Sequence, residues 1–207
     1  MYWARILMGV IFHPVEAFER IKYYRNKSKS LPVFVMFCLI LVVRVASIYI
    51  THFPFARLKP EDTNIMLEIV KHIIPIASWG ITTYAITSIW DGECFLGECM
   101  IGAVTAMIPY VVMTIPISLF SRLLEENQKG FIDFLDSVIV MWVLLLLFIG
   151  TMVMNDYTFK KTAGVYMVCM AGVLLLWAIF LLLATLTYQL YDSVRDLMIE
   201  FRIQTGL

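Results

Sequence analysis

Residues 91–116 read DGECFLGECMIGAVTAMIPYVVMTIP, and this stretch decides the fold. A short acidic turn leads directly into an apolar segment that contains Pro109 and Pro116. Each proline removes a backbone donor and clashes with the carbonyl four residues earlier, so the sequence predicts a helix broken at both positions. In lipid the freed carbonyls must be satisfied by protein, so such a helix belongs in the middle of a membrane bundle.

The composition around this stretch is that of an integral membrane protein. Of the 207 residues, 61% are hydrophobic and 15% are charged, whereas roughly 25% of the residues in soluble domains are charged. Several apolar stretches reach the ~20 residues that cross a ~30 Å hydrocarbon core. We therefore expect an all-α polytopic membrane bundle with five transmembrane helices and an amphipathic helix at each end. Its expected partners are membrane lipids and other integral membrane proteins, and no nucleic acid.

The expected spans follow one another with short connections. They cover residues 32–53, 66–90, 98–121, 134–154 and 165–186. The corresponding regions are a basic amphipathic segment (1–30), a five-span membrane domain (31–187) and a C-terminal helical tail (188–207). Five spans place the termini on opposite sides of the membrane. Lysine and arginine totals for the two sides are nearly equal, so the basic cluster just before the first span decides the orientation. It predicts a cytoplasmic N-terminus, an outside C-terminus and a cytoplasmic acidic turn.

An amphipathic helix is expected to begin at Pro14. Its apolar residues Val15, Phe18 and Ile21 recur at helical spacing. An apolar face with basic surroundings is typical of a helix that lies on the cytoplasmic leaflet. The same pattern fits a helix that packs on the bundle or on a partner protein, and both interpretations stay open.

Arg44 lies near the middle of the first span. A charge there costs from about 3 to more than 10 kcal/mol, so the side chain must face the bundle interior, a partner or a water-filled cavity. One interpretation is a functional site residue. The other is a structural ion pair, for example with Asp133 or Asp136, or snorkelling to the interface. Pro75 predicts a further kink in the second span.

The acidic turn groups Asp91, Gly92, Glu93 and Glu98 beside the third span. Its functional interpretation is a patch that binds a cation or a partner. The alternative is an ordinary solvated turn, because Asp-Gly is a common turn pair and a glutamate is favourable at the positive end of a helix.

No catalytic or cofactor motif is recognisable in the sequence. It contains no GxSxG elbow, HExxH helix or Walker loop, and its three histidines lie in separate segments. Cys94 and Cys99 are five residues apart, which is not a zinc-ligand spacing. We therefore expect no enzymatic activity, no metal site and no cofactor.

Three stretches resemble the bacterial branch of the Yip family, a five-span membrane domain first met in Rab-GTPase-interacting proteins of the ER and Golgi. They are HPVEAFERIKYYR (13–25), WDGECFLGECMIGAVTAMIPYVVMTIP (90–116) and LLFIGTMVMNDYTFKKT (146–162). The sequence departs from the eukaryotic members in lacking their long polar N-terminal region with its Asp-Leu-Tyr-Gly-Pro-type motif. That departure counts against Rab-linked trafficking.

The resemblance implies a non-enzymatic accessory or scaffold subunit in a bacterial cytoplasmic membrane. Short members of this kind resemble proteins encoded beside carbohydrate ABC importers, which implies ABC permease subunits as partners. Two alternatives remain. One is a self-sufficient transporter or channel for a small solute or ion that uses Arg44 and the acidic turn. The other is a membrane-shaping or trafficking factor that acts through the amphipathic ends.

Overall fold

The structure is a computed structural model that describes residues 9–23, 30–51, 63–124 and 128–205. Within these ranges the ordered elements are helices and no strand occurs. The expected all-α membrane bundle is therefore confirmed. The start of the N-terminal segment, the basic linker over 24–29 and most of the connection after the first span (52–62) lie outside the described residues.

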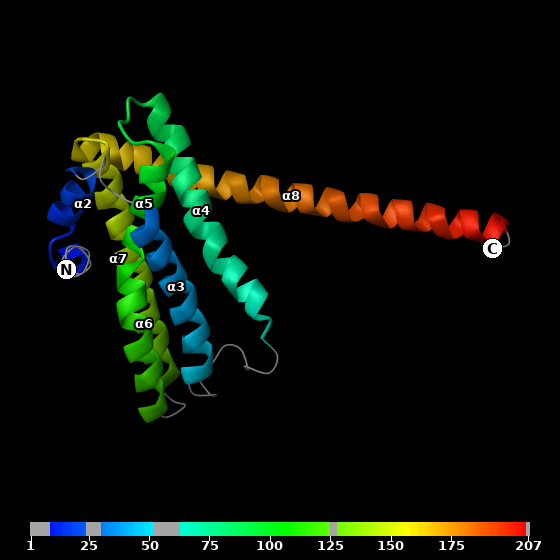
Figure 1. Cartoon of the computed structure of the whole chain (residues 1–207), viewed down its shortest axis with the longest axis horizontal. Coiled ribbons are helices and arrows are strands. Elements are labelled where there is room, and N and C mark those ends of the chain that lie inside the picture. The colour runs from blue at the N-terminus through cyan, green and yellow to red at the C-terminus, as the bar shows by residue number, and fades with distance from the viewer. Residues whose placement is uncertain (1–8, 24–29, 52–62, 125–127, 206–207) are drawn as a thin grey trace. The chain divides into compact units, whose positions relative to one another are not determined.

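The chain divides into two compact units, Met1–Cys169 and Met170–Leu207. The first unit begins with the short helix α2 and continues through the membrane helices to the start of α8 (Figure 1). Its elements are α2 (Pro14–Tyr23), α3 (Ser30–Ile50), α4 (Ile65–Ile89), α5 (Leu96–Ala106), α6 (Ile108–Phe120), the 3-10 turn η2 (Ser121–Leu123), α7 (Lys129–Met154) and the first residues of α8 (Phe159–Thr205).

Four helical stretches in the described part are long and apolar enough to cross a membrane. They are Ile65–Ile89, Leu96–Leu123, Gly130–Met154 and Phe159–Asp196. A shorter apolar helix, Phe34–Ile50, forms most of α3. Each expected span thus coincides with a helix, and the third span is built by α5, α6 and η2 in succession.

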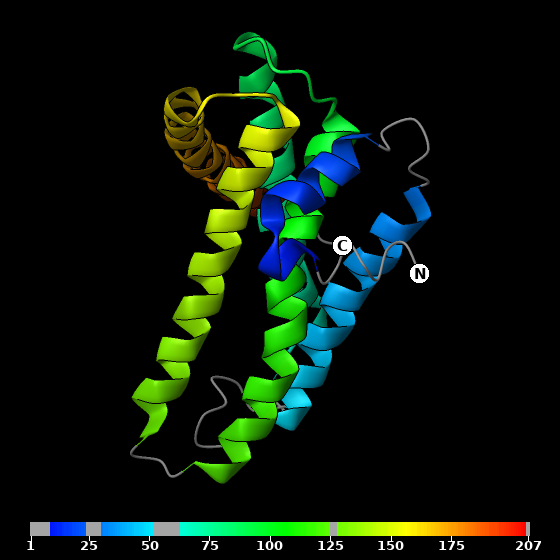
Figure 2. The same cartoon turned by 90° about the vertical axis from the view of Figure 1, so that its left-hand side faces the viewer.

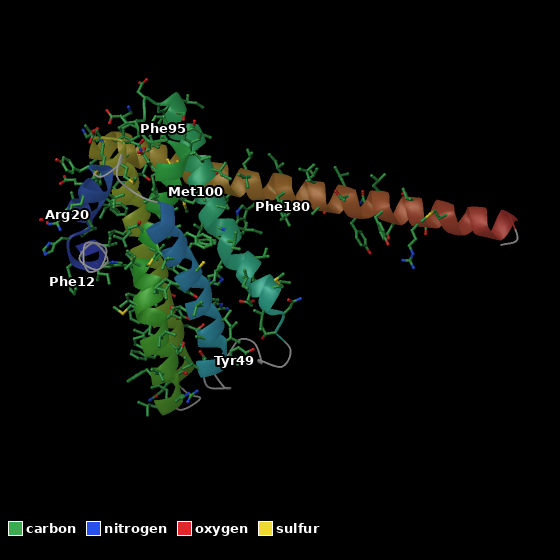
Figure 3. The ribbon with its side chains drawn as sticks, viewed as in Figure 1. Phe12, Arg20, Tyr49, Phe95, Met100 and Phe180 are labelled. Atoms are coloured by element: carbon green, nitrogen blue, oxygen red, sulfur yellow. The ribbon has the colours of Figure 1, made fainter. Side chains whose placement is uncertain are left out.

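The third span lies at the centre of the first unit. Its first half, α5, packs on α3, α4 and α7, and its second half, α6, packs on α3 and α7 (Figures 1 and 2). Small residues set this close approach. A Cβ atom at Gly80 would collide with the Met100 sulfur, and one at Gly102 would lie 3.0 Å from Met154 Sδ. Figure 3 marks Met100 on α5.

The third span is interrupted near its first proline, Pro109, and not at its second, Pro116, where the sequence also predicted a break. The interruption falls at Met107, whose N–H donates to the Val104 carbonyl (3.2 Å), and Pro109 follows in the first turn of α6. Proline is tolerated in a first turn because its missing N–H has no helical partner there. Pro116 lies inside α6 and Pro75 inside α4, and both helices continue through them. Losing one donor leaves the neighbouring helical bonds in place, so no break follows at 116.

The second unit is the remainder of α8. Two hydroxyls in this apolar helix are satisfied within it, because Thr185 donates to the Leu181 carbonyl and Thr187 to the Leu183 carbonyl, both at 2.8 Å. The whole of α8 has 47 residues, more than twice the ~20 that cross a bilayer. The expected C-terminal tail is therefore a continuation of the fifth span as far as Thr205.

Candidate functional site

Two polar clusters lie at opposite ends of the first unit. The first is the loop platform, which we define as Lys22, residues 90–95 and residues 155–158. The second is the polar cavity between α3, α6 and α7. Figure 3 marks Phe95 at the platform end and Tyr49 at the cavity end.

Two tight turns form the loop platform. The turn after α4 passes through Asp91 at φ 52°, and the turn after α7 passes through Asp156 at φ 51°. Aspartate is one of the few residues other than glycine that enters this left-handed region at modest cost. Both turns therefore reverse the chain within a few residues and bring 90–95 next to 155–158.

Hydrogen bonds to the backbone lock the two turns together. The Tyr157 hydroxyl donates to the Trp90 carbonyl at 2.8 Å. The Cys94 N–H donates to Asn155 Oδ1 at 3.3 Å, and the Cys94 thiol donates to the Met154 carbonyl at 3.2 Å. A buried backbone group that loses its hydrogen-bond partner costs roughly 1–3 kcal/mol. These bonds therefore favour a single geometry for the joint, by which we mean the contact between the two turns.

Gly92 permits this close approach. Its N–H donates to the Thr87 carbonyl at 2.7 Å. A Cβ atom at this position would lie 2.6 Å from Thr87 Cβ and 2.7 Å from Asn155 Oδ1. Any side chain at 92 would therefore push the acidic turn off the α7–α8 turn.

The helix α2 packs on α7 and lies across the bundle near the platform (Figure 2). Phe18 and Ile21 are buried in the core cluster, and Phe18 lies against Gly150 of α7. Val15 is exposed. Lys22 then forms ion pairs with Glu93 (3.2 Å) and Asp156. The apolar face of α2 is thus used for packing on the bundle, and its lysine joins the two turns.

Glu98 stabilises the start of α5. Its Oε2 accepts a hydrogen bond from the Phe95 N–H at 2.9 Å. A carboxylate at this position also interacts favourably with the positive end of the helix. Among the sequence-predicted acidic residues, Glu98 has a local structural role and Glu93 reaches across to α2.

The protonation states of the platform follow from burial and neighbours. Burial opposes the charged form of Lys22, but its hydrogen bonds to Asp156 and Glu93 outweigh this and raise the pKa of its ammonium group. Contact with Cys99 and then burial hold the pKa of the Cys94 thiol well above its ordinary value. Burial, followed by the charge of Asp91, raises the pKa of Tyr157. Near neutral pH the platform therefore holds a charged lysine, a neutral thiol and a neutral phenol.

The surface of the platform combines charge with exposed apolar groups. The side chains of Glu93 and Asp156 are 57% and 66% exposed. Phe95, within the platform, is 65% exposed, and Ile89, at the end of α4, is exposed as well. The platform thus presents an aromatic side chain close in the sequence to an exposed carboxylate.

The cavity end contains the intramembrane charge predicted from sequence. Arg44 donates from Nη2 (2.7 Å) and Nε (3.2 Å) to Glu68 Oε2. Lys71 donates to Glu68 Oε1 at 2.8 Å. The Glu68 side chain is only 3% exposed, whereas that of Lys71 is 55% exposed. Arg44 is thus one member of a buried ion pair, and its partner is Glu68 rather than the aspartates suggested by the sequence.

His72 extends this cluster towards α6. Its Nδ1 lies 3.1 Å from the Glu68 carbonyl and its Nε2 lies 3.2 Å from the Tyr110 hydroxyl. The two rings are 5.5 Å apart. This contact joins α4 to α6 through a polar pair inside the membrane region.

Next to the ion pair lies a cavity of about 680 Å³. Arg44, Asp133 and Asp136 all line it. Hydroxyl groups form much of the remaining wall, from Ser47, Thr51, Tyr110, Thr114, Ser118, Ser121 and Ser137. Apolar residues complete it, among them Ile48, Ile139 and Leu144. The structure therefore brings the predicted charge and both predicted aspartates to one cavity.

Sequence reasoning missed Glu68, Asn155 and Asp156 as members of these clusters. Glu68 follows the start of the second span, where a charge is ordinary at an interface, so nothing local distinguished it. A signal did exist for the other two, because MNDYTFKK follows the fourth span as a polar turn. Among the described residues, no group of three or more histidine, cysteine or acidic side chains is arranged to hold a metal ion.

The comparisons with known proteins gave one family match. No curated protein and no solved structure matched the chain. The Yip1 domain matches residues 8–182. This range includes α2, the loop platform and the polar cavity. The chain therefore belongs to the Yip1 domain family of membrane proteins.

Proposed function

We propose that this protein is a non-enzymatic accessory subunit that binds another integral membrane protein through the loop platform. The observation that carries the proposal is the interlocked joint between the two turns and α2. Such a joint holds exposed acidic and aromatic side chains in a fixed arrangement, so little conformational entropy is lost when a partner binds.

The partner class that we propose is the permease subunit of a bacterial carbohydrate ABC importer. Its support is the resemblance of short Yip-type chains to proteins encoded beside such importers. We propose further that the protein resides in the bacterial cytoplasmic membrane with the platform and N-terminus facing the cytoplasm. The basic residues before α3 support this orientation.

The test is a pull-down from the native host in mild detergent, with stoichiometry measured by mass spectrometry. Recovery of permease subunits at a fixed ratio is the expected result. Phe95→Ser should lower that recovery at least about tenfold, because aromatic anchors contribute ~2 kcal/mol or more to interfaces. Tyr49→Ser is the matched control, since Tyr49 is comparably exposed (56%) at the other end of the unit. Recovery of this protein alone would contradict the proposal.

A second candidate function is transport of a small solute or ion, favoured by the cavity beside Arg44. Polar cavities with charges inside a membrane domain are typical of transport paths. The test is efflux from liposomes that contain only this protein. The double variant Arg44→Met/Glu68→Leu removes the ion pair without leaving a buried charge, and it should abolish efflux. Equal efflux from this variant and the wild type would contradict the candidate.

Membrane shaping through α2 has less support. Phe18 and Ile21 face the bundle core, so Val15 is the exposed one of the three predicted apolar residues. Vesicles of anionic lipid should therefore bind the full chain no differently after Val15→Ala.

A further inference from the structure

Three sulfur-containing side chains meet where the loop platform joins α5. The thiols of Cys94 and Cys99 are in contact, and both residues are buried, at 7% and 6% exposed. Met154, the last residue of α7, approaches the same helix. A Cβ atom at Gly102, one turn after Cys99, would lie 3.0 Å from Met154 Sδ. A loop, α5 and α7 thus each contribute one sulfur atom to the same region.

A small cavity lies among these residues. Its volume is about 20 Å³, and Cys94, Cys99, Gly102 and Met154 all line it. A cavity needs roughly 10–15 Å³ to hold one water molecule. This one therefore has room for a single water-sized occupant, such as a metal ion, and none for an organic ligand.

Two polar side chains of the cavity wall are already engaged by the backbone. Asn155 Oδ1 accepts from the Cys94 N–H at 3.3 Å, and Asn155 Nδ2 donates to the Thr151 carbonyl at 3.0 Å. The Thr151 hydroxyl donates to the Leu147 carbonyl at 2.8 Å. The Cys94 thiol gives its hydrogen to the Met154 carbonyl at 3.2 Å. The sulfur lone pairs are thus the groups that the wall can offer to an occupant.

The chemistry of sulfur ligands selects a soft metal ion. Thiolate and thioether groups prefer Cu(I), whereas Mg²⁺ and Ca²⁺ take oxygen ligands. Structural zinc sites use four ligands, and the spacing of the two cysteines already counted against zinc. Cu(I) is satisfied by two or three sulfur atoms and does not need that spacing. We propose that Cys94, Cys99 and Met154 form a binding site for one Cu(I) ion.

Binding exchanges two thiol protons for one metal ion. The protons pass to solvent, and the complex of two thiolates with Cu(I) carries one negative charge. Lys22 lies near Cys94, although its ammonium group already pairs with two carboxylates. The Thr83 hydroxyl lines the cavity and, within the described residues, makes no hydrogen bond to oxygen or nitrogen. Its hydrogen can therefore be donated to a sulfur atom, as its position beside the Cys169 thiol also indicates.

The test is transfer of Cu(I) from its coloured bicinchoninate complex to the full chain in phosphatidylcholine nanodiscs, without oxygen and with reduced thiols. We expect each chain to withdraw one Cu(I) ion and empty nanodiscs to withdraw none. An excess of Zn²⁺ should leave this stoichiometry unchanged. Absence of transfer, or displacement of Cu(I) by Zn²⁺, would overturn the proposal. Partner binding is a separate property, so the result of the pull-down leaves this site standing.

Three variants locate the site. Cys94→Ser/Cys99→Ser should abolish transfer, whereas Cys38→Ser, which removes a thiol of α3 outside this cavity, should leave it unchanged. Met154→Leu conserves the side-chain volume and keeps both thiols, and it should raise the Kd for Cu(I) at least about tenfold. This variant tests the site even if the serine variant does not fold. Wild-type Cu(I) binding by either cavity variant as a monodisperse protein would overturn the assignment.

X-ray absorption at the copper edge distinguishes this site from adventitious binding at the surface. Sulfur neighbours alone are expected around the bound ion. Nitrogen or oxygen neighbours would indicate imidazole or carboxylate ligands, which this cavity does not offer, and would overturn the assignment.

Discussion

The loop platform and the buried ion pair hold helices together in different ways. At the platform, neutral hydrogen bonds to backbone atoms form the joint, and the charges of Glu93 and Asp156 stay exposed. At the cavity end, the charge of Glu68 is removed from solvent and depends on Arg44 and Lys71. The comparison predicts that removing one charge costs little stability where water reaches its partner and much more where the partner is buried.

Typical ion-pair energies predict different effects on stability at the two ends of the unit. An exposed ion pair contributes about 0–1 kcal/mol, because water and salt solvate the separated charges nearly as well. A buried pair contributes little net stability when formed, but removing one member costs about 3–5 kcal/mol, because the other stays uncompensated. The same interaction type thus predicts a small effect at Lys22 and a large one at Arg44.

The largest expected effect therefore comes from Arg44→Met. We expect the free energy of unfolding to fall by about 3 kcal/mol, towards the lower end of the range for buried pairs because Lys71 still contacts Glu68. SDS titration in mixed micelles measures this change.

Two further variants separate charge from packing at this site. Arg44→Met/Glu68→Leu should recover most of the lost stability, since no buried charge then remains. Lys71→Met should cost less than 1 kcal/mol, roughly, because Lys71 is half exposed and Arg44 still neutralises Glu68. If the double variant is as unstable as Arg44→Met, the loss comes from packing and the comparison drawn here fails.

The sequence predicted the helices well and the contacts between them poorly. Hydropathy locates spans because a run of ~20 apolar residues is a local property. The partner of Arg44 is a non-local property: Asp133, Asp136 and Glu68 were all acidic residues near span ends, and only the packing of α4 on α3 selects Glu68. The sequence predicted helix breaks or kinks at Pro75, Pro109 and Pro116, but the helix is interrupted only near Pro109. Whether a helix continues past a proline depends on the neighbouring hydrogen bonds as well as on the proline itself.

The platform illustrates the same division. The acidic turn could be recognised from Asp91-Gly92, but the sequence left open whether it binds a ligand or is merely solvated. Its contact with Asn155 and Tyr157 joins residues more than 60 positions apart. No periodicity in one sequence encodes such a contact, so the joint emerges only from the structure.

An effect of intermediate size is expected at the hydrogen-bonded joint between the two turns. Gly92→Ala places a Cβ within 2.6 Å of Thr87 Cβ, and we expect a loss of about 1–3 kcal/mol, as for other overpacked sites. Gly97→Ala is the matched control, because nothing lies within 4 Å of its Cβ and alanine favours the helix. The readout is again SDS titration, and equal stability of the two variants would show that the turns are not locked together.

The smallest expected effect is that of Lys22→Met. We expect a loss of about 0.5–1 kcal/mol at low salt, which shrinks at 1 M salt as the screening length falls to about 3 Å. Hydrogen exchange of the amides in α2 is the appropriate readout, because the loss is local.

The difference in stability between the wild type and Lys22→Met should depend on pH in one direction. Hydrogen bonds to Asp156 and Glu93 raise the pKa of Lys22 above its ordinary value of 10.5 despite its burial, so the folded state holds the proton more tightly than the unfolded state does. The stabilisation is complete below pH 10.5 and is lost as the pH rises through the raised pKa. The wild type and Lys22→Met should therefore differ by a constant amount from pH 7 to about 9 and converge only above 10.5. A stability difference that changes with neither salt nor alkali would mean that Phe18 and Ile21 alone hold α2 on the bundle.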